Sequence, residues 1–307
     1  MLQVVLNNKA GQATQKVARI LSRVTVGERI PTVTALTEEC QTARGNVQLA
    51  ITNLRNAGAV QLEAHGQNGT VLTGIDYRSL ARVCGVQNLV GSMPLPYTRR
   101  YKGMATALYT LLNNGEVTNL IAFMRGSEAR IRGLQEGRSN YTVISRMAYQ
   151  EYQRRGIPLK EVLDCGPHSY VGRHVLIMRP GFNGEWNGCR VGIDASSADQ
   201  NYLTRTFFKG MGVQFIPAQY TQFLTMLQRG DMDVGIWNED DLDGQGMELR
   251  CEPFTLPEAQ AHEDDRAVIV VQQDDMLMSH LLWEFLSVKS LIDIQQQVMR
   301  GERVDCY

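Results

Sequence analysis

The chain has 307 residues, of which 43% are hydrophobic and 21% charged, and its net charge at pH 7 is −1. This composition is typical of a globular protein with a full core and excludes a largely disordered chain. The length favours two domains, or one domain joined to a bilobal unit. Residues 1–75 carry seven Lys or Arg against four Asp or Glu, whereas the remainder has a net charge of −4. We therefore expect a mildly basic head on an acidic body.

Neither end of the chain predicts a membrane segment. The N-terminal residues MLQVVLNNKAGQ do not place a long apolar run after a basic start, and the apolar stretch at 267–271 is far too short to span a bilayer. We expect a cytoplasmic protein with no membrane partner. The cysteines lack paired spacing, which argues against a zinc ribbon, a redox dithiol or a disulfide framework. We expect no metal or cofactor, and most of these thiols in the core: Cys40, Cys84, Cys165, Cys189, Cys251 and Cys306.

Three helices are predicted in the head. The first covers Thr14–Val24, and the second begins after Pro31 with Thr32 as its N-cap. Apolar residues recur at helical spacing in the second and third helices, at Val33, Leu36 and Cys40 and then at Val47, Ala50, Ile51 and Leu54. Gly58 stands where a left-handed helix end is needed. The pattern predicts a helix-turn-helix whose third helix packs one face inward.

The opposite face of the third helix is polar and rich in hydrogen-bond donors. Such side chains can bond phosphates and base edges in a major groove, so we expect this helix to bind double-stranded DNA. Arg19 and Arg23 on the first helix could reach phosphate, but solvated charges are the simpler interpretation. We expect the DNA contacts to come from Thr42, Arg44, Asn46, Gln48, Thr52, Arg55 and His65.

After the third helix, Val60 and Leu62 alternate with polar residues, a glycine-rich turn follows, and Val71 and Thr73 are expected to pair back as a wing. The segments GERIPTVTAL, ARGNVQLAITNLRNAGAV and HGQNGTVLT resemble the winged-helix domain of the GntR family of bacterial transcription regulators. One residue departs from that family, because Ala43 stands where a serine usually caps the recognition helix. Either Thr42 provides the cap, or this helix binds DNA less tightly. A winged helix can also serve as a protein-docking module.

The body reads as two α/β lobes. We assign residues 76–86 to a connecting helix and residues 87–307 to a bilobal domain, after a winged-helix head over residues 1–75. Apolar runs alternate with helix-period segments, which predicts βαβ units and mostly parallel sheets. The expected strands are 88–91, 117–124, 141–145, 170–178, 189–194, 213–216, 232–237 and 267–271, and the expected helices are 98–113, 127–136, 199–209, 220–228 and two within 276–299.

The second lobe contains RVGIDASSADQNYLTRTF and, after a strand, YTQFLTMLQRGDMDVGIWN. These segments resemble the type II periplasmic-binding-protein fold, which bacterial regulators use to sense small effectors. The resemblance implies the two-lobed architecture and a DNA-binding regulator. In open parallel α/β sheets the carboxyl ends of the strands face a cleft, where we expect a ligand. Helix N-termini at that edge favour anions, and arginines can clamp a carboxylate or phosphate.

We therefore expect a small anionic metabolite, held by residues at the ends of the predicted strands. A neutral or cationic ligand would instead use the acidic loop, with Asp240 and Asp241 at the rim. Each serine in the set could equally be a simple helix cap, and Arg125 could form a salt bridge across the sheet end. The expected ligand contacts are Ser92, Arg125, Gly126, Ser127, Ser145, Arg146, Ser196, Ser197, Trp237 and Asn238.

Catalytic patterns are weak. No dinucleotide loop, P-loop, HExxH helix or nucleophile elbow is present. Cys165, His168 and His174 could suggest a thiol and a base, and the acidic stretch 231–265 lacks the ligand spacing of a calcium loop and favours a solvated acidic face. We expect a non-enzymatic, dimeric transcription regulator. The alternative is a small-molecule-binding enzyme of the same bilobal fold with a docking head.

Overall fold

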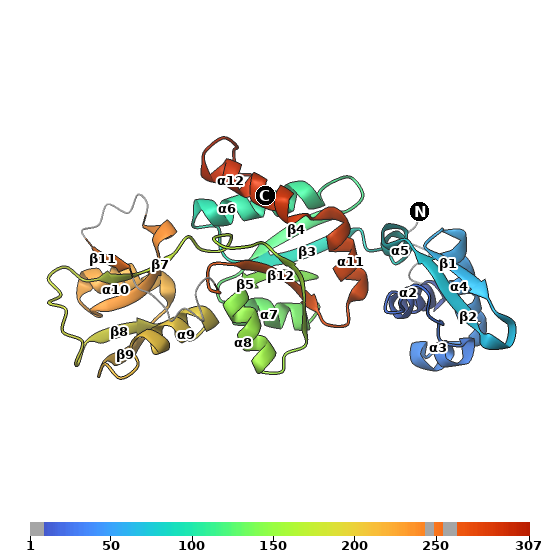
Figure 1. The fold of residues 1–307 in the computed structure, drawn as a ribbon, viewed down its shortest axis with the longest axis horizontal. Helices are drawn as coiled ribbons and strands as arrows, with labels where there is room; N and C mark the ends of the chain where they lie inside the picture. The colour runs from blue at the N-terminus through green and yellow to red at the C-terminus, as the bar shows by residue number, and fades with distance from the viewer. Residues whose placement is uncertain (1–8, 243–248, 254–262) are drawn as a thin grey trace. The chain divides into compact units, whose positions relative to one another are not determined.

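A computed structural model of the protein describes residues 9–242, 249–253 and 263–307. The chain forms two compact units, which are described separately (Figure 1). The first comprises Met1–Leu89 together with Leu112–Asn119 and Val271–Leu286. The second comprises Val90–Leu111, Leu120–Val270 and Ser287–Tyr307.

The first unit opens with the expected helix-turn-helix, in helices α2 (Lys9–Leu21), α3 (Val33–Cys40) and α4 (Arg44–Asn56). Thr32 caps α3, since its side chain accepts a hydrogen bond from the Ala35 amide. The backbone reverses at Gly58, whose φ of +70° confirms the left-handed position. The apolar stripes of the three helices meet in a buried core that includes Val17, Leu21, Leu36, Cys40, Val47, Ala50 and Leu54.

Strands β1 (Val60–Ala64) and β2 (Thr70–Ile75) form the antiparallel wing. The expected wing is present: Val71 pairs with Glu63, and Leu72, which pairs with Leu62, is the buried residue of β2. The pairing shifts register between Gln61 and Leu62. An irregularity of this kind moves every following side chain to the other face, and an alternation pattern in the sequence does not reveal it.

Two further helices belong to the first unit. The short helix α5 (Tyr77–Val83) is capped by Asp76, whose carboxylate accepts from two backbone amides of its first turn. It packs against α11 (Met276–Phe285), where the Tyr77 and His280 rings stack with centroids 3.9 Å apart. The segment after the wing therefore forms a helix that packs within the first unit, with Leu80 buried.

The first lobe of the second unit is built on the sheet β4-β3-β5-β12-β6. Its strands are β3 (Asn88–Met93), β4 (Thr118–Phe123), β5 (Tyr141–Ser145), β6 (Leu159–Asp164) and β12 (Ala267–Gln272). Its helices are α6 (Arg99–Leu112), α7 (Ser127–Gln135), α8 (Arg146–Arg154) and α12 (Val288–Met299). The run AVIVV in β12 is fully buried, as a central strand requires.

The second lobe is built on the sheet β11-β7-β10-β8-β9. Its strands are β7 (His174–Met178), β8 (Arg190–Ile193), β9 (Gln214–Pro217), β10 (Val234–Asn238) and β11 (Arg250–Pro253). Its helices are α9 (Ala198–Phe207), α10 (Phe223–Arg229) and the short turns η2 (Tyr220–Gln222) and η3 (Glu239–Asp241). The chain then returns to the first lobe as β12.

The sheets are mixed rather than mostly parallel. β12 runs antiparallel to β5, and β10 and β11 both run antiparallel to β7. The expected strand 170–178 begins only at His174, and α8, β6 and β11 were not foreseen. These elements were missed because polar and charged residues interrupt their apolar patterns. Within the described part of the chain, no helix is both long and apolar enough to cross a membrane.

Candidate DNA-contacting face and ligand pocket

The outer face of α4 carries the donors that the sequence predicts. Arg44, Gln48, Thr52 and Arg55 are all exposed, while Val47, Ala50 and Leu54 on the opposite face are buried. Arg44 is the first residue of the helix and Arg55 lies in its last turn. These side chains can therefore reach outward without disturbing the core.

Thr42 does not provide the cap of α4. Ala43 occupies the N-cap position, and no side chain caps the helix there. The Thr42 hydroxyl instead accepts a hydrogen bond of 3.2 Å from the Asn46 amide group, and both residues are partly buried. Thr42 thus fixes Asn46 rather than the helix backbone. No side chain occupies the N-terminal end of α4, where helix amides can bind a phosphate.

His65, the last of the seven predicted DNA contacts, lies in the wing. It is exposed and precedes the one-turn helix Gly66–Asn68 at the tip. Its Nε2 atom is 3.8 Å from a carboxylate oxygen of Glu63. The structure places His65 on a different element from α4.

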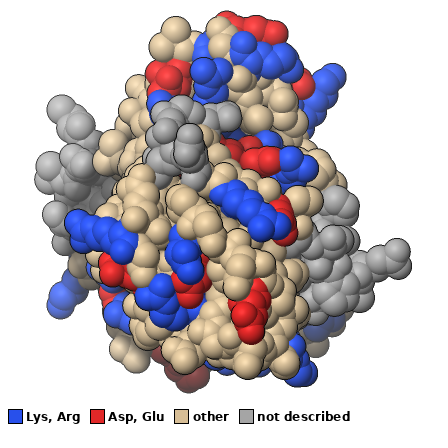
Figure 2. All heavy atoms as spheres, turned by 90° about the vertical axis from the view of Figure 1, so that its left-hand side faces the viewer, with Lys and Arg blue, Asp and Glu red and all other residues tan. Residues whose placement is uncertain are grey.

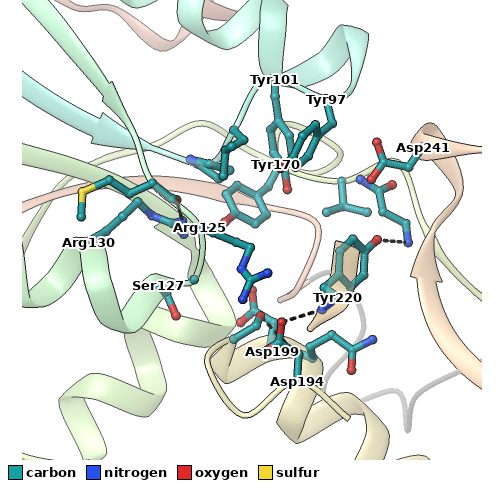
Figure 3. A pocket seen from close by; sticks show the side chains of 18 of the residues that line it. Tyr97, Tyr101, Arg125, Ser127, Arg130, Tyr170, Asp194, Asp199, Tyr220 and Asp241 are labelled. Carbon is teal, nitrogen blue, oxygen red and sulfur yellow. Dashed lines mark hydrogen bonds between the residues drawn. The ribbon is translucent and has the colours of Figure 1, made fainter. Parts of the chain in front are cut away.

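A pocket with a cavity volume of about 120 Å³ lies in the second unit, lined by residues of both lobes (Figure 3). For scale, a cavity of about 150 Å³ accommodates a benzene ring. The pocket therefore suits a small molecule. Of the expected ligand contacts, Arg125, Gly126, Ser127, Ser197 and Asn238 line it.

The other expected contacts do not line the pocket, and two of them, Ser145 and Arg146, bind other side chains of the framework. Ser92 is buried in β3. Ser145 caps α8 and donates a 2.7 Å hydrogen bond to Asp199. The guanidinium of Arg146 is held by Glu161 and Asp164, at 2.7 and 2.8 Å. Arg146 therefore contacts strand β6. The sequence pattern did not predict this strand.

Ser196 and Trp237 are also displaced from the expected positions. Ser196 is exposed and lines a different hollow, beside α9. The indole of Trp237 is buried and stacks flat on the Tyr220 ring, with centroids 3.9 Å apart and an interplanar angle of 6°. Tyr220 therefore lines the pocket where the sequence predicts Trp237, and the Trp237 indole packs against the Tyr220 ring.

Two arginines line the pocket and differ in their partners. Arg125 donates to the side chains of Gln219 and Thr221 in the second lobe, at 2.7 and 3.2 Å, so it links the lobes. Arg130 on α7 is only 3% exposed. It donates to the Met124 carbonyl and the Tyr170 hydroxyl, at 2.8 and 3.1 Å, and its Nε atom is buried without a hydrogen-bond partner among the described residues.

The pocket end of α7 is also open to an acceptor. Gly126 precedes the helix with a φ of +74°, and no side chain caps the first turn. A Cβ at this position would lie 2.6 Å from the Ser196 carbonyl oxygen, so only glycine fits between the lobes here. Together with Arg130, the free amides of α7 form a donor-rich wall.

Aromatic and acidic side chains line the rest of the pocket. Tyr97 is 54% exposed, and the Tyr101 and Tyr170 rings meet edge to face with centroids 5.4 Å apart. Burial raises the pKa of Asp199 to about 6, despite the hydrogen bond from Ser145. Burial and the neighbouring Asp240 raise the pKa of Asp241 to about 6 as well.

Asp194, a third carboxylate, serves the framework. One of its oxygens accepts from the amide and hydroxyl of Ser196, at 2.9 and 2.6 Å. The other accepts a 2.8 Å hydrogen bond from the Tyr220 amide. Asp194 thus positions the Tyr220 segment. Sequence reasoning missed most of this lining, namely Pro94, Leu95, Tyr97, Tyr101, Met124, Arg130, Tyr170, Val171, His174, Asp194, Gln200 and Tyr220.

Cys165, His168 and His174, the weak catalytic candidate, do not provide a reactive thiol and a base. Burial raises the pKa of Cys165 to about 12, so the thiol stays protonated near neutral pH. His168 pairs with Asp265 and His174 with Asp264, at 2.9 and 2.5 Å. Four of the six cysteines are buried, namely Cys40, Cys84, Cys165 and Cys189.

The acidic stretch 231–265 is only partly a solvated face, and residues 243–248 and 254–262 of it lie outside the described residues. Several of its carboxylates are paired: Asp233 with Arg179 and Arg190, and Glu239 with Arg173. Figure 2 shows basic and acidic side chains interspersed over one face of the molecule. Among the described residues, no group of acidic, histidine and cysteine side chains is arranged to hold a metal ion.

The second unit has the fold of the periplasmic binding proteins. The aliphatic sulphonate binding protein SsuA from Escherichia coli superimposes with a TM-score of 0.52 at 12% identity, over 70% of this chain and 75% of its own. A helix-turn-helix domain model matches residues 25–72. The fold and the pocket thus define a helix-turn-helix protein with a bilobal α/β domain of the periplasmic-binding-protein type.

The chain belongs to the YhfZ family. The model of the YhfZ C-terminal domain matches residues 76–307. An uncharacterized protein YhfZ from Escherichia coli (strain K12) is 36% identical over 306 residues, which span 97% of this chain and 98% of that protein. The crystal structure of YhfZ from Shigella flexneri is 34% identical, with a TM-score of 0.64 over 76% of this chain and 98% of its own.

Proposed function

We propose that this protein is a cytoplasmic DNA-binding transcription regulator, and that a small metabolite in the bilobal domain controls its affinity for DNA. The observation that carries the proposal is the exposed, donor-rich face of α4 in a helix-turn-helix. Base edges and phosphates are read by this combination of Arg, Gln and Thr side chains. The resemblance of the head to GntR-type winged helices supports the same docking, with α4 in the major groove.

The metabolite is proposed to carry an anionic group. Arg130 supports this, because a buried guanidinium with an unpaired Nε is costly unless an acceptor completes it. The uncapped first turn of α7 offers further donors at the same wall. We infer no catalytic role for the pocket.

Homodimerisation is the third part of the proposal. Helix-turn-helix regulators read palindromic sites as two-fold dimers. A metabolite that favours one arrangement of the lobes would then alter the spacing of the two heads.

The DNA part is tested by pulling down genomic fragments with the pure protein at two salt concentrations. We expect a small set of fragments to be retained at the higher salt, and affinity to fall as salt rises. Retention of all fragments equally, or of none, contradicts the proposal. Sedimentation of the protein with the best fragment measures the oligomeric state.

The ligand part is tested by melting curves with a metabolite library on the parent, Arg130→Gln and Arg125→Ala proteins. A ligand at one hundred times its dissociation constant adds about 2.7 kcal/mol to the free energy of unfolding. We expect anionic hits whose shifts disappear in Arg130→Gln. Anionic hits that survive that change would remove Arg130 as the anchor.

A further inference from the structure

The pocket described above has two chemically different ends. In Figure 3, Arg125, Arg130 and Ser127 lie on one side, while Tyr97, Tyr101 and Asp241 lie on the other. The first side is rich in donors and supports the anionic group of the proposed function. The second side presents aromatic rings and a carboxylate, which recognise a different chemistry.

The aromatic side is built from both lobes. Tyr97 and Tyr101 flank the start of α6 in the first lobe, whereas Tyr220 and Asp241 belong to the second. The Tyr220 ring is fixed by its stack on Trp237, and its hydroxyl accepts a 2.8 Å hydrogen bond from the Asn238 amide. The stack and the hydrogen bond together hold the Tyr220 ring in one orientation.

Asp241 lies close to these rings. Burial raises the pKa of Tyr101 and of Tyr220 well above the usual value, and the negative charge of Asp241 contributes to both shifts. Asp240, its neighbour, is neutralised by Arg100, whose Nε is 2.8 Å from the carboxylate. No described basic side chain forms an ion pair with Asp241. The negative charge on this side of the pocket is therefore not compensated by the described residues.

Aromatic rings and an uncompensated carboxylate around one small space are features that bind a cationic nitrogen. The faces of aromatic rings attract an ammonium group through their quadrupoles. A carboxylate that faces the same space supplies the opposite charge. An anion would be repelled here, and a neutral polar group would leave the carboxylate unpaired.

We propose that the ligand carries a small ammonium group, primary or methylated, which sits among Tyr97, Tyr101, Tyr220 and Asp241, opposite its anionic group. This inference rests on the proposed function, since it assigns the second end of the same pocket. The ligand is then a small zwitterion. The cavity volume of about 120 Å³ limits it to a short molecule in which the two charges lie close together.

The test uses small charged probes and neutral molecules of the same shape on the full-length protein. Each ammonium probe is compared with its neutral counterpart: tetramethylammonium chloride with tert-butanol, and methylammonium chloride with methanol. All samples have equal ionic strength. Saturation-transfer NMR of the probe methyl signals measures binding. We expect at least one ammonium probe to bind at least fivefold more tightly than its neutral counterpart. Equal binding of charged and neutral members in both pairs overturns the inference.

Single substitutions test whether the ammonium probes bind beside Asp241 and Tyr97. Asp241→Asn is expected to reduce ammonium binding at least fivefold, whereas Asp293→Asn, which removes an exposed carboxylate on α12, should leave it unchanged. Tyr97 is exposed enough to change without loss of the core, so Tyr97→Phe should retain binding and Tyr97→Ser should weaken it. Unchanged ammonium binding in Asp241→Asn overturns the assignment.

Sodium acetate and the best genomic fragment are measured on the same samples. If acetate and DNA bind but the ammonium preference is absent, only the inference fails. If the ammonium preference is present and depends on Asp241, but acetate does not bind, the inference stands and the anionic part of the proposed function fails.

Discussion

The guanidinium of Arg100 lies 2.8 Å from Asp240, and the next residue, Asp241, has no such partner among the described residues. Of these two adjacent carboxylates, Asp240 is therefore paired with a cation, whereas Asp241 is not paired with a described one. Arg100 comes from α6 and Asp240 from η3, so the ion pair also joins the two lobes. The pairing leaves Asp241 free to serve the pocket rather than the framework.

Asp241 should destabilise the ligand-free protein at neutral pH. Burial and Asp240 raise its pKa to about 6, and Tyr101 and Tyr220 also face it. An unfolded aspartate has a pKa of about 3.9. Because the folded pKa is the higher one, the folded state binds more protons in this range, and stability falls as pH rises from about 4 to 6.

We therefore predict that Asp241→Asn raises the melting temperature at pH 7.5 by about 2–4 °C, which corresponds to about 1 kcal/mol for a unit of this size. At pH 4 the two proteins should melt together. Calorimetry at both values measures the difference. A lower melting temperature for the variant at pH 7.5 would count against an uncompensated charge.

Asp233 should have the opposite pH dependence. Arg190 and Arg179 hold its pKa well below the usual value, with Arg190 bonding both carboxylate oxygens at 2.8 and 3.1 Å. The stability that it contributes is present above pH 4 and is lost as pH falls below that value. We expect Asp233→Asn to cost about 1–3 kcal/mol at pH 7. Exposed Asp231→Asn is the control, and an equal loss in both variants would contradict the assignment.

Gly126 should be required for contact between the lobes. Gly126→Ala places a methyl group 2.6 Å from the Ser196 carbonyl at a φ of +74°. Gly137→Ala is a matched control, because its φ is +70° and nothing lies within 4 Å. The control should lose about 1 kcal/mol from backbone strain alone. We expect a larger loss and weaker ligand-induced melting shifts in Gly126→Ala; equal behaviour of the two variants would contradict this.

Much of the head could be predicted from the sequence, whereas half of the expected pocket residues were misplaced. Helical periodicity locates Leu36, Val47 and Leu54 in the core because each helix buries one stripe. The partner of Arg146 could not be foreseen, since it lies on β6, whose pattern LKEVLD is broken by charges. Arg130 lies inside a helix, and only the packing of α7 in the folded chain turns it toward the pocket.

Aromatic pocket residues were missed for a related reason. Tyr101 and Tyr170 come from segments far apart in the sequence, and no spacing rule joins them. The sequence places Asp240 and Asp241 together at the rim for a neutral or cationic ligand, and only the Arg100–Asp240 pair distinguishes the two carboxylates. Pairing across the lobes is a property of the tertiary structure and is not visible in local composition.

Arg44→Ala tests most directly whether α4 binds DNA. Arg44 is exposed at the start of α4, and in helix-turn-helix proteins this end of the recognition helix contacts base edges in the major groove. We predict that the change weakens binding to the best genomic fragment by about 1–3 kcal/mol at fixed salt and relaxes sequence preference. If Arg44→Ala binds that fragment as tightly and as selectively as the parent protein, α4 is not the recognition helix and the proposed docking is wrong.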